Sequence, residues 1–135
     1  MTNFNQDQSS NLAGHILQGC LAVDTSLDAV KSLFTNEDVY EIYYLKEDKK
    51  EVTLEVVFDS LTLLCLFDDN LICESVFLLP DDLADIIQCI EYCNKTYPYD
   101  RKLKGWVTYN RIIQVNTCHK ECSLSILPIQ RTKES

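Results

Sequence analysis

Apolar residues recur every three or four positions in three segments of the chain, which is the spacing of one face of an α-helix. Residues suited to the start of a helix precede each segment: Ser9 or Ser10, then residues 24–26, then residues 80–82. The pattern predicts two N-terminal helices and a third helix near residues 81–95. The apolar runs themselves occupy residues 12–21, 27–34 and 83–93.

Between the second and third of these helices, apolar and polar residues alternate with a period of two. The clearest case is residues 51–58, where apolar side chains at even positions alternate with Glu51, Thr53 and Glu55. Such alternation predicts a sheet with one buried and one solvated face. Residues 61–67 are apolar at both faces, which is typical of a central strand. We therefore predict a four-stranded meander over residues 40–79.

The C-terminal third has weaker signals. Residues 96–105 form a basic, tyrosine-bearing stretch that we expect to be a loop, followed by a hairpin of residues 106–115 and 124–129 around a turn at 116–122. The predicted fold class is α+β: an antiparallel sheet made of the meander plus this hairpin, packed by the three helices. We expect one domain over residues 10–130, with residues 1–9 and 131–135 disordered.

Charge is distributed unevenly along the chain. Residues 1–94 carry 18 acidic and 4 basic side chains, whereas residues 95–135 carry 3 acidic and 8 basic ones. The acidic part is patterned with apolar residues, so it predicts a folded acidic surface that attracts basic proteins and repels nucleic acid and anionic membranes. We expect a basic protein partner, no nucleic acid and no membrane, and we leave monomer and homodimer open.

Carboxylates and tyrosines of the meander are the candidate partner-binding residues. We expect those on the strands to gather on the solvated face of the sheet, where they suit lysine and arginine side chains of a partner. A solvated face that only prevents aggregation is the alternative interpretation. Two further carboxylates belong to the predicted hairpin turn after residue 67. The full set is Glu41, Tyr43, Glu51, Glu55, Asp68 and Asp69.

Seven cysteines, an odd number, occur in a chain whose first ten residues have neither a basic start nor an apolar run. This favours reduced thiols in a cytoplasmic protein over a disulfide framework. A zinc site is the alternative, because Cys89 and Cys93 share a helical face and Cys118, His119 and Cys122 cluster in one predicted turn. Both spacers hold three residues rather than the usual two, so we predict buried structural thiols, no metal and no cofactor.

Catalytic motifs are scarce. The chain has two histidines, His15 and His119, and neither pairs in sequence with a nucleophile in an orienting motif. The paired aspartates at 68–69 and 81–82 fit a hairpin turn and a helix start better than a cation site. We therefore predict a protein that is not an enzyme.

Two resemblances suggest what such a protein binds. Residues 86–94, followed by the hairpin from Trp106, resemble the type III secretion chaperone-like (YbjN-type) proteins, which implies an adaptor that holds an extended partner segment. The extra N-terminal helix and the lack of a C-terminal helix depart from that pattern. In physical character the chain also resembles bacterial immunity proteins, small acidic α+β proteins that cover the active site of a basic toxin. Our leading hypothesis is an immunity-type inhibitor of a basic toxin, such as a nuclease; the adaptor is the alternative, and a zinc- or thiol-dependent protein is the third.

Overall fold

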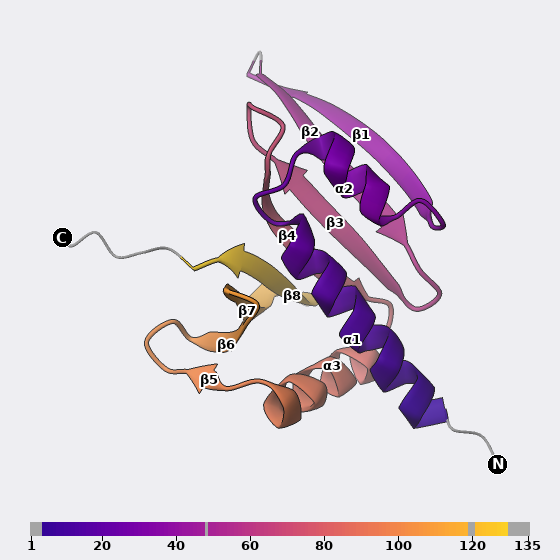
Figure 1. The fold of residues 1–135 in the computed structure, drawn as a ribbon, viewed down its shortest axis with the longest axis vertical. Helices are drawn as coiled ribbons and strands as arrows, with labels where there is room; N and C mark the ends of the chain where they lie inside the picture. The colour runs from indigo at the N-terminus through magenta and orange to yellow at the C-terminus, as the bar shows by residue number, and fades with distance from the viewer. Residues whose placement is uncertain (1–3, 48, 119–120, 130–135) are drawn as a thin grey trace.

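The computed structural model describes residues 4–47, 49–118 and 121–129. Within them the chain forms three helices and eight strands (Figure 1). In chain order they are α1 (Phe4–Ala22), α2 (Leu27–Leu33), β1 (Asp38–Lys46), β2 (Lys49–Val57), β3 (Leu61–Phe67), β4 (Cys73–Pro80), α3 (Leu83–Thr96), β5 (Tyr99–Asp100), β6 (Gly105–Thr108), β7 (Arg111–Cys118) and β8 (Glu121–Pro128).

The eight strands form one antiparallel sheet in the order β1-β2-β3-β4-β8-β7-β6-β5. The meander β1–β4 and the C-terminal strands are joined where β4 pairs with β8, through Val76 opposite Ile126 and Leu78 opposite Leu124. The predicted fold class, an α+β protein with an antiparallel meander and a C-terminal hairpin, is confirmed.

The C-terminal strands differ in detail from the prediction. Residues 106–115 are not one strand, because Tyr109 and Asn110 form a tight turn between β6 and β7, with φ of 50° and 63°. Two consecutive positive φ values are typical of a type I′ hairpin turn, whose twist matches that of the strands. The sequence of such a turn usually contains a glycine. The predicted turn at 116–122 is mostly strand, since Asn116 pairs with Ser123 and Thr117 with Cys122.

The helices begin close to their predicted starts, except the first. Ser26 caps α2 by accepting a hydrogen bond from the Ala29 backbone N–H, and Asp82 is the N-cap residue of α3. Helix α1 already begins at Phe4, so it includes part of the segment expected to be disordered. Residues 1–3 and 131–135 lie outside the described residues.

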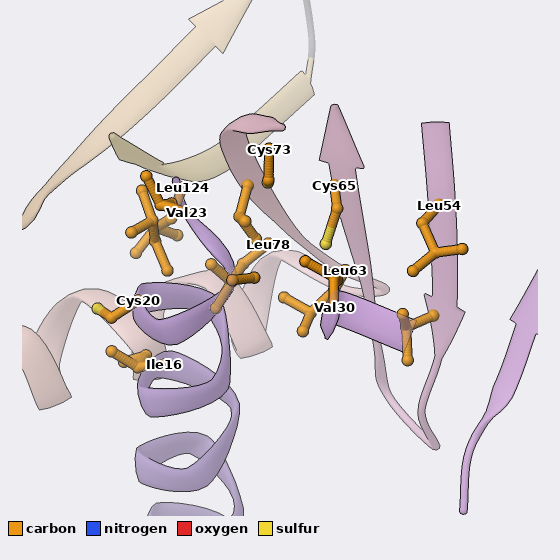
Figure 2. Close-up of a cluster of buried hydrophobic side chains, with 14 of the residues drawn as sticks. Ile16, Cys20, Val23, Val30, Leu54, Leu63, Cys65, Cys73, Leu78 and Leu124 are labelled. Atoms are coloured by element: carbon orange, nitrogen blue, oxygen red, sulfur yellow. The ribbon is translucent and has the colours of Figure 1, made fainter. Parts of the chain in front are cut away.

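All three helices share one core on a single face of the sheet; α1 and α2 are seen in front of it in Figure 1. Alternate residues of β2 and β3 point into this core, such as Leu54, Leu63 and Cys65. Ile16 of α1 and Val30 of α2 belong to the same core (Figure 2). Burial of aliphatic side chains of this kind contributes about 1.5–3 kcal/mol each.

Helix α1 approaches the sheet closely because residue 19 is glycine. A Cβ at Gly19 would lie 2.6 Å from Cδ1 of Ile126 in β8. The connection between α1 and α2 also runs along the start of β4: Asp24 donates its backbone N–H to the Cys73 carbonyl at 2.8 Å, and Leu27 donates to the Leu71 carbonyl at 2.9 Å. These contacts hold both N-terminal helices over the same face of the sheet.

Candidate partner-binding face

The face of the sheet opposite the three helices carries its own set of side chains, which we call the open face. The core contains Leu63 and Leu78 but not their neighbours on the same strands, which point to the other side. Within the described residues, no helix packs on that other side. The open face is formed by Tyr40, Ile42, Tyr44, Glu51, Thr53, Glu55, Leu64, Leu66, Phe77 and Leu79.

The centre of the open face is apolar. Leu64 of β3 lies directly opposite Phe77 of β4, with Leu66 and Leu79 beside them, and all four side chains are only half-buried. None of the four belongs to the core cluster. A contiguous apolar patch on a helix-free sheet face is typical of an interaction site.

The margin of the open face combines tyrosines with carboxylates. Tyr40 is paired across the strands with Glu55, and Tyr44 with Glu51; the two tyrosines are 54% and 53% exposed. Directly opposite residues on antiparallel strands have Cβ atoms about 4.5–5.5 Å apart, so each glutamate has a tyrosine as its cross-strand neighbour. Neither glutamate forms an ion pair among the described residues. A carboxylate beside an aromatic ring suits an arginine, which can pair with one and stack on the other.

Glu41 and Tyr43 do not lie on this face, so the expected grouping of all four meander residues was wrong. Tyr43 is opposite Val52, a core residue, and Glu41 therefore also points to the helix side. There the Lys31 ammonium donates to Glu41 at 2.7 Å, and the Tyr43 hydroxyl donates to the same carboxylate. The hydrogen bond from Lys31, together with that from Tyr43, lowers the pKa of the Glu41 carboxyl. Glu41 is thus already occupied by partners within its own chain.

The two aspartates of the β3–β4 turn have different roles. Asp68 accepts backbone hydrogen bonds from Asn70 at 2.8 Å and from Ile72 at 3.0 Å, which is how an aspartate side chain stabilises a turn. Asp69 is exposed and lies 4.0 Å from the Lys49 ammonium. Of the pair, Asp69 is the one whose carboxylate is available to a partner.

The candidate zinc ligands do not come together among the described residues. Cys89 and Cys93 are buried in the core, and burial raises their thiol pKa values to about 11 and about 12. Cys122 is half-buried in β8; the side chain of Cys118 and residue His119 lie outside the described part. Within that part, no group of three or more histidine, cysteine, aspartate or glutamate side chains is placed to hold a metal ion. The described thiols behave as small apolar groups.

A cavity of about 400 Å³ opens on the helix side, between α1, the start of α3 and the β2–β3 turn. The residues that line it include four acidic ones, Glu37, Asp38, Asp59 and Asp85, and no lysine or arginine. His15 also lines it, with its ring centroid 4.0 Å from that of Phe58 and the two planes tilted by 38°, and burial lowers the pKa of this imidazole. The helix side therefore carries a second acidic surface, separate from the glutamates of the open face.

The residues at the centre of the open face were absent from the predicted site, although the sequence held a signal for them. Residues 61–67 are apolar at both faces, which is typical of a central strand, and β3 does lie between β2 and β4. Only Leu61, Leu63, Cys65 and Phe67 enter the core; Leu64 and Leu66 face outward. When a strand is apolar on both faces but helices cover only one face of its sheet, the second apolar set of side chains forms a surface on the uncovered face.

Comparison of the chain with protein-family models, with curated proteins and with solved structures gives no match. Among the described helices, none combines the length and the apolar character needed to cross a membrane.

Proposed function

We propose that this protein is not an enzyme and works by binding a basic protein on the open face, as an immunity-type inhibitor that neutralises a basic toxin. The observation that carries the proposal is the helix-free sheet face itself: an apolar centre around Leu64 and Phe77, bordered by Glu51 and Glu55 beside exposed tyrosines. An apolar centre with a polar rim is the usual composition of a protein interface.

Charge supports a basic partner. The chain has a net charge of −9, and 18 of its 21 acidic residues lie in residues 1–94, the segment that builds the meander and most of the three helices. Such a field accelerates the approach of a cationic surface and depends on ionic strength. Enzymes that act on nucleic acid have cationic phosphate-binding clefts, so a negative, tyrosine-bearing face can cover such a cleft and displace the substrate.

The state of the cysteines fits a reducing compartment. The six cysteines whose side chains are described are all free, and five of them are buried. We propose the cytoplasm as the location, where such thiols stay reduced.

The apolar centre of the open face also favours the second candidate, a YbjN-type, secretion chaperone-like adaptor. An adaptor holds an extended segment of its partner, whereas an inhibitor binds a folded protein. The two are separated by unfolding the captured partner: an adaptor retains the denatured chain or its peptides, and an inhibitor loses it.

The test is capture from a lysate of the source cells on immobilised protein, with washes at low and then high salt and mass spectrometry of the eluate. We expect one basic protein at a near-equimolar ratio on the wild type. Leu64→Glu/Phe77→Glu, which places charge in the apolar centre, is expected to lose it. Asp59→Lys/Asp85→Lys, which changes the charge of the helix-side cavity, is expected to retain it. Retention by the first variant and loss by the second would move the site to the cavity.

A further inference from the structure

The two edges of the sheet are built differently. One edge is β5, a strand of two residues, Tyr99–Asp100. The other edge is β1, a strand of nine residues whose pairing with β2 is regular from Asp38 to Lys46, without a bulge. A very short edge strand is a common protection against pairing with another chain, while a long regular edge exposes a row of backbone donors and acceptors.

Several of the usual protections of a strand edge are missing from β1 among the described residues. Its only strand partner there is β2, on its inner side, and the strand contains no proline. Tyr40 and Tyr44 are more than half exposed, and Leu45 is 80% exposed. An exposed large leucine beside a free strand edge forms a surface suited to strand addition.

We propose that β1 is a homodimer interface, in which β1 of a second copy pairs antiparallel with it about a two-fold axis at Ile42. The sheets of the two copies then become one continuous sheet. A two-fold interface uses the same surface on both copies, so the strand must be complementary to its own reverse.

The sequence of β1 meets that condition in the register centred on Ile42. In this register the Cα position of Asp38, at one end of the strand, lies opposite that of Lys46 at the other end, and Glu41 lies opposite Tyr43 rather than another carboxylate. Opposite charges and aromatic pairs facing each other across antiparallel strands contribute about 0.2–1 kcal/mol each. The full set of pairs, each made twice except the central one, is Asp38–Lys46, Val39–Leu45, Tyr40–Tyr44, Glu41–Tyr43 and Ile42–Ile42.

Neighbouring registers are worse. Sliding one copy of β1 by one residue would place a residue whose N–H and C=O point toward the partner opposite a residue whose groups point away, so the register can change only in steps of two residues. A step of two residues moves the two-fold axis to the neighbouring residue, Glu41 or Tyr43. A two-fold axis at Glu41 places the two Glu41 carboxylates opposite each other, which is destabilising. With the axis at Tyr43, Asp38 of each copy lies beyond the end of the partner strand, so the two Asp38–Lys46 pairs of the dimer are lost.

This dimer does not depend on the proposed function. It uses the backbone edge of β1, while Leu64 and Phe77 are on strands further into the sheet and remain exposed. The pairing of Tyr40 with Tyr44 of the second copy joins the two open faces side by side.

Charge exchange tests both the dimer and its register. Molar mass is measured by light scattering and sedimentation equilibrium up to millimolar concentration, for Asp38→Lys, Lys46→Asp, and the double variant Asp38→Lys/Lys46→Asp. We expect a dimer for the wild type, a dissociation constant weakened about tenfold in each single variant, and recovery in the double variant. Asp81→Lys, which makes the same charge change away from β1, is the control and is expected to dimerise like the wild type. A wild type that is monomeric throughout, or single variants that dimerise as the control does, would overturn the proposal.

Cross-linking gives a second measurement that does not depend on affinity. With the two-fold axis at Ile42, mild oxidation of Ile42→Cys is expected to give a covalent dimer on a non-reducing gel, beyond what the native cysteines of the wild type give. Tyr40→Cys places the new thiol opposite Tyr44 of the second copy instead of opposite itself, so it is expected to stay near the wild-type background. Equal cross-linking of the two variants would contradict the register and with it the proposal.

Discussion

The Nε of Arg111, at the start of β7, donates a hydrogen bond of 3.1 Å to the carbonyl of Cys20 in the last turn of α1. The same guanidinium donates from Nη2 to the Val23 carbonyl at 2.9 Å, and its Nη1 lies 3.5 Å from the Asp24 carboxylate. The last carbonyls of a helix have no partners within it and carry partial negative charge, so a cation is favourable there. Arg111 thereby connects the C-terminal strands to the first helix, 91 residues earlier in the chain.

Loss of this contact is expected to destabilise the whole domain. Arg111→Met keeps much of the side-chain packing but removes every donor, and we expect the free energy of unfolding to fall by about 2 kcal/mol, since hydrogen bonds to charged groups contribute about 1.5–3 kcal/mol. Arg111→Lys keeps the charge but not the forked donors, so its free energy of unfolding is expected to lie between those of the wild type and Arg111→Met. The measurement is urea denaturation; an unchanged midpoint for Arg111→Met would contradict the role.

The Lys31–Glu41 pair is expected to be visible in a titration but nearly silent in stability. The hydrogen bond from Lys31 lowers the pKa of Glu41, so this carboxyl is expected to titrate below its usual range by NMR and to move back toward it in Lys31→Met. Exposed pairs contribute little to stability, so Glu41→Gln should change the denaturation midpoint only slightly. Because Glu41 is engaged on the helix side, the same variant is expected to bind the basic partner as the wild type does. Weak binding by Glu41→Gln would place the interface on the helix side.

Buried thiols give the protein a limit at alkaline pH. Burial raises the pKa of Cys20 and Cys89 from 9.0 to about 11 and that of Cys93 to about 12. A thiol whose pKa is higher in the folded state ionises first in the unfolded chain, so stability is present below pH 9 and is lost as the pH rises through the folded values. We expect the denaturation midpoint to decrease above pH 9 under reducing conditions, and Cys93→Ala to reduce the slope of that decrease.

The same burial predicts selective alkylation. At neutral pH, Cys89 and Cys93 are expected to react with iodoacetamide far more slowly than Cys122, which is half-buried. Mass spectrometry of peptides after short exposure measures the three rates. Rapid labelling of Cys89 or Cys93 in the folded protein would show that α3 is not packed on the core.

Neighbouring residues of β3 provide a matched comparison of the two faces. Leu63 is fully buried in the core, and Leu63→Ala is expected to cost about 2–5 kcal/mol. Leu64 is on the open face, so Leu64→Ala should cost less than half as much while weakening the complex with the basic partner. Equal costs would mean that the open face is covered.

The sequence predicted the elements better than it predicted the faces. The alternation in β2 is unambiguous because Glu51, Thr53 and Glu55 alternate with two valines and a leucine, and Val52 and Leu54 are indeed in the core. In β1 both sets of alternate residues are partly apolar, so hydrophobicity does not decide which set faces the helices. The pairing of Tyr43 with Val52 decides it, and this register is a property of two strands together.

The C-terminal strands illustrate a second limit. A turn at Tyr109-Asn110 needs positive φ at both residues, which asparagine tolerates and tyrosine rarely adopts. No glycine or proline marks the place, so residues 106–115 look like one strand. The sheet supplies the missing information, because β6 must fold back on β7 to place Trp106 opposite Ile113 in the core.

The central claim is that the open face binds a basic protein, and association kinetics with the captured partner test it most directly. We would measure the association rate from low to high salt for Glu51→Lys/Glu55→Lys and for the charge-matched Asp59→Lys/Asp85→Lys. We expect the first variant to associate about tenfold or more slowly at low salt and to lose most of its salt dependence, with the second changed much less. Equal slowing in both variants, or slowing only in the second, would contradict the assignment of the open face.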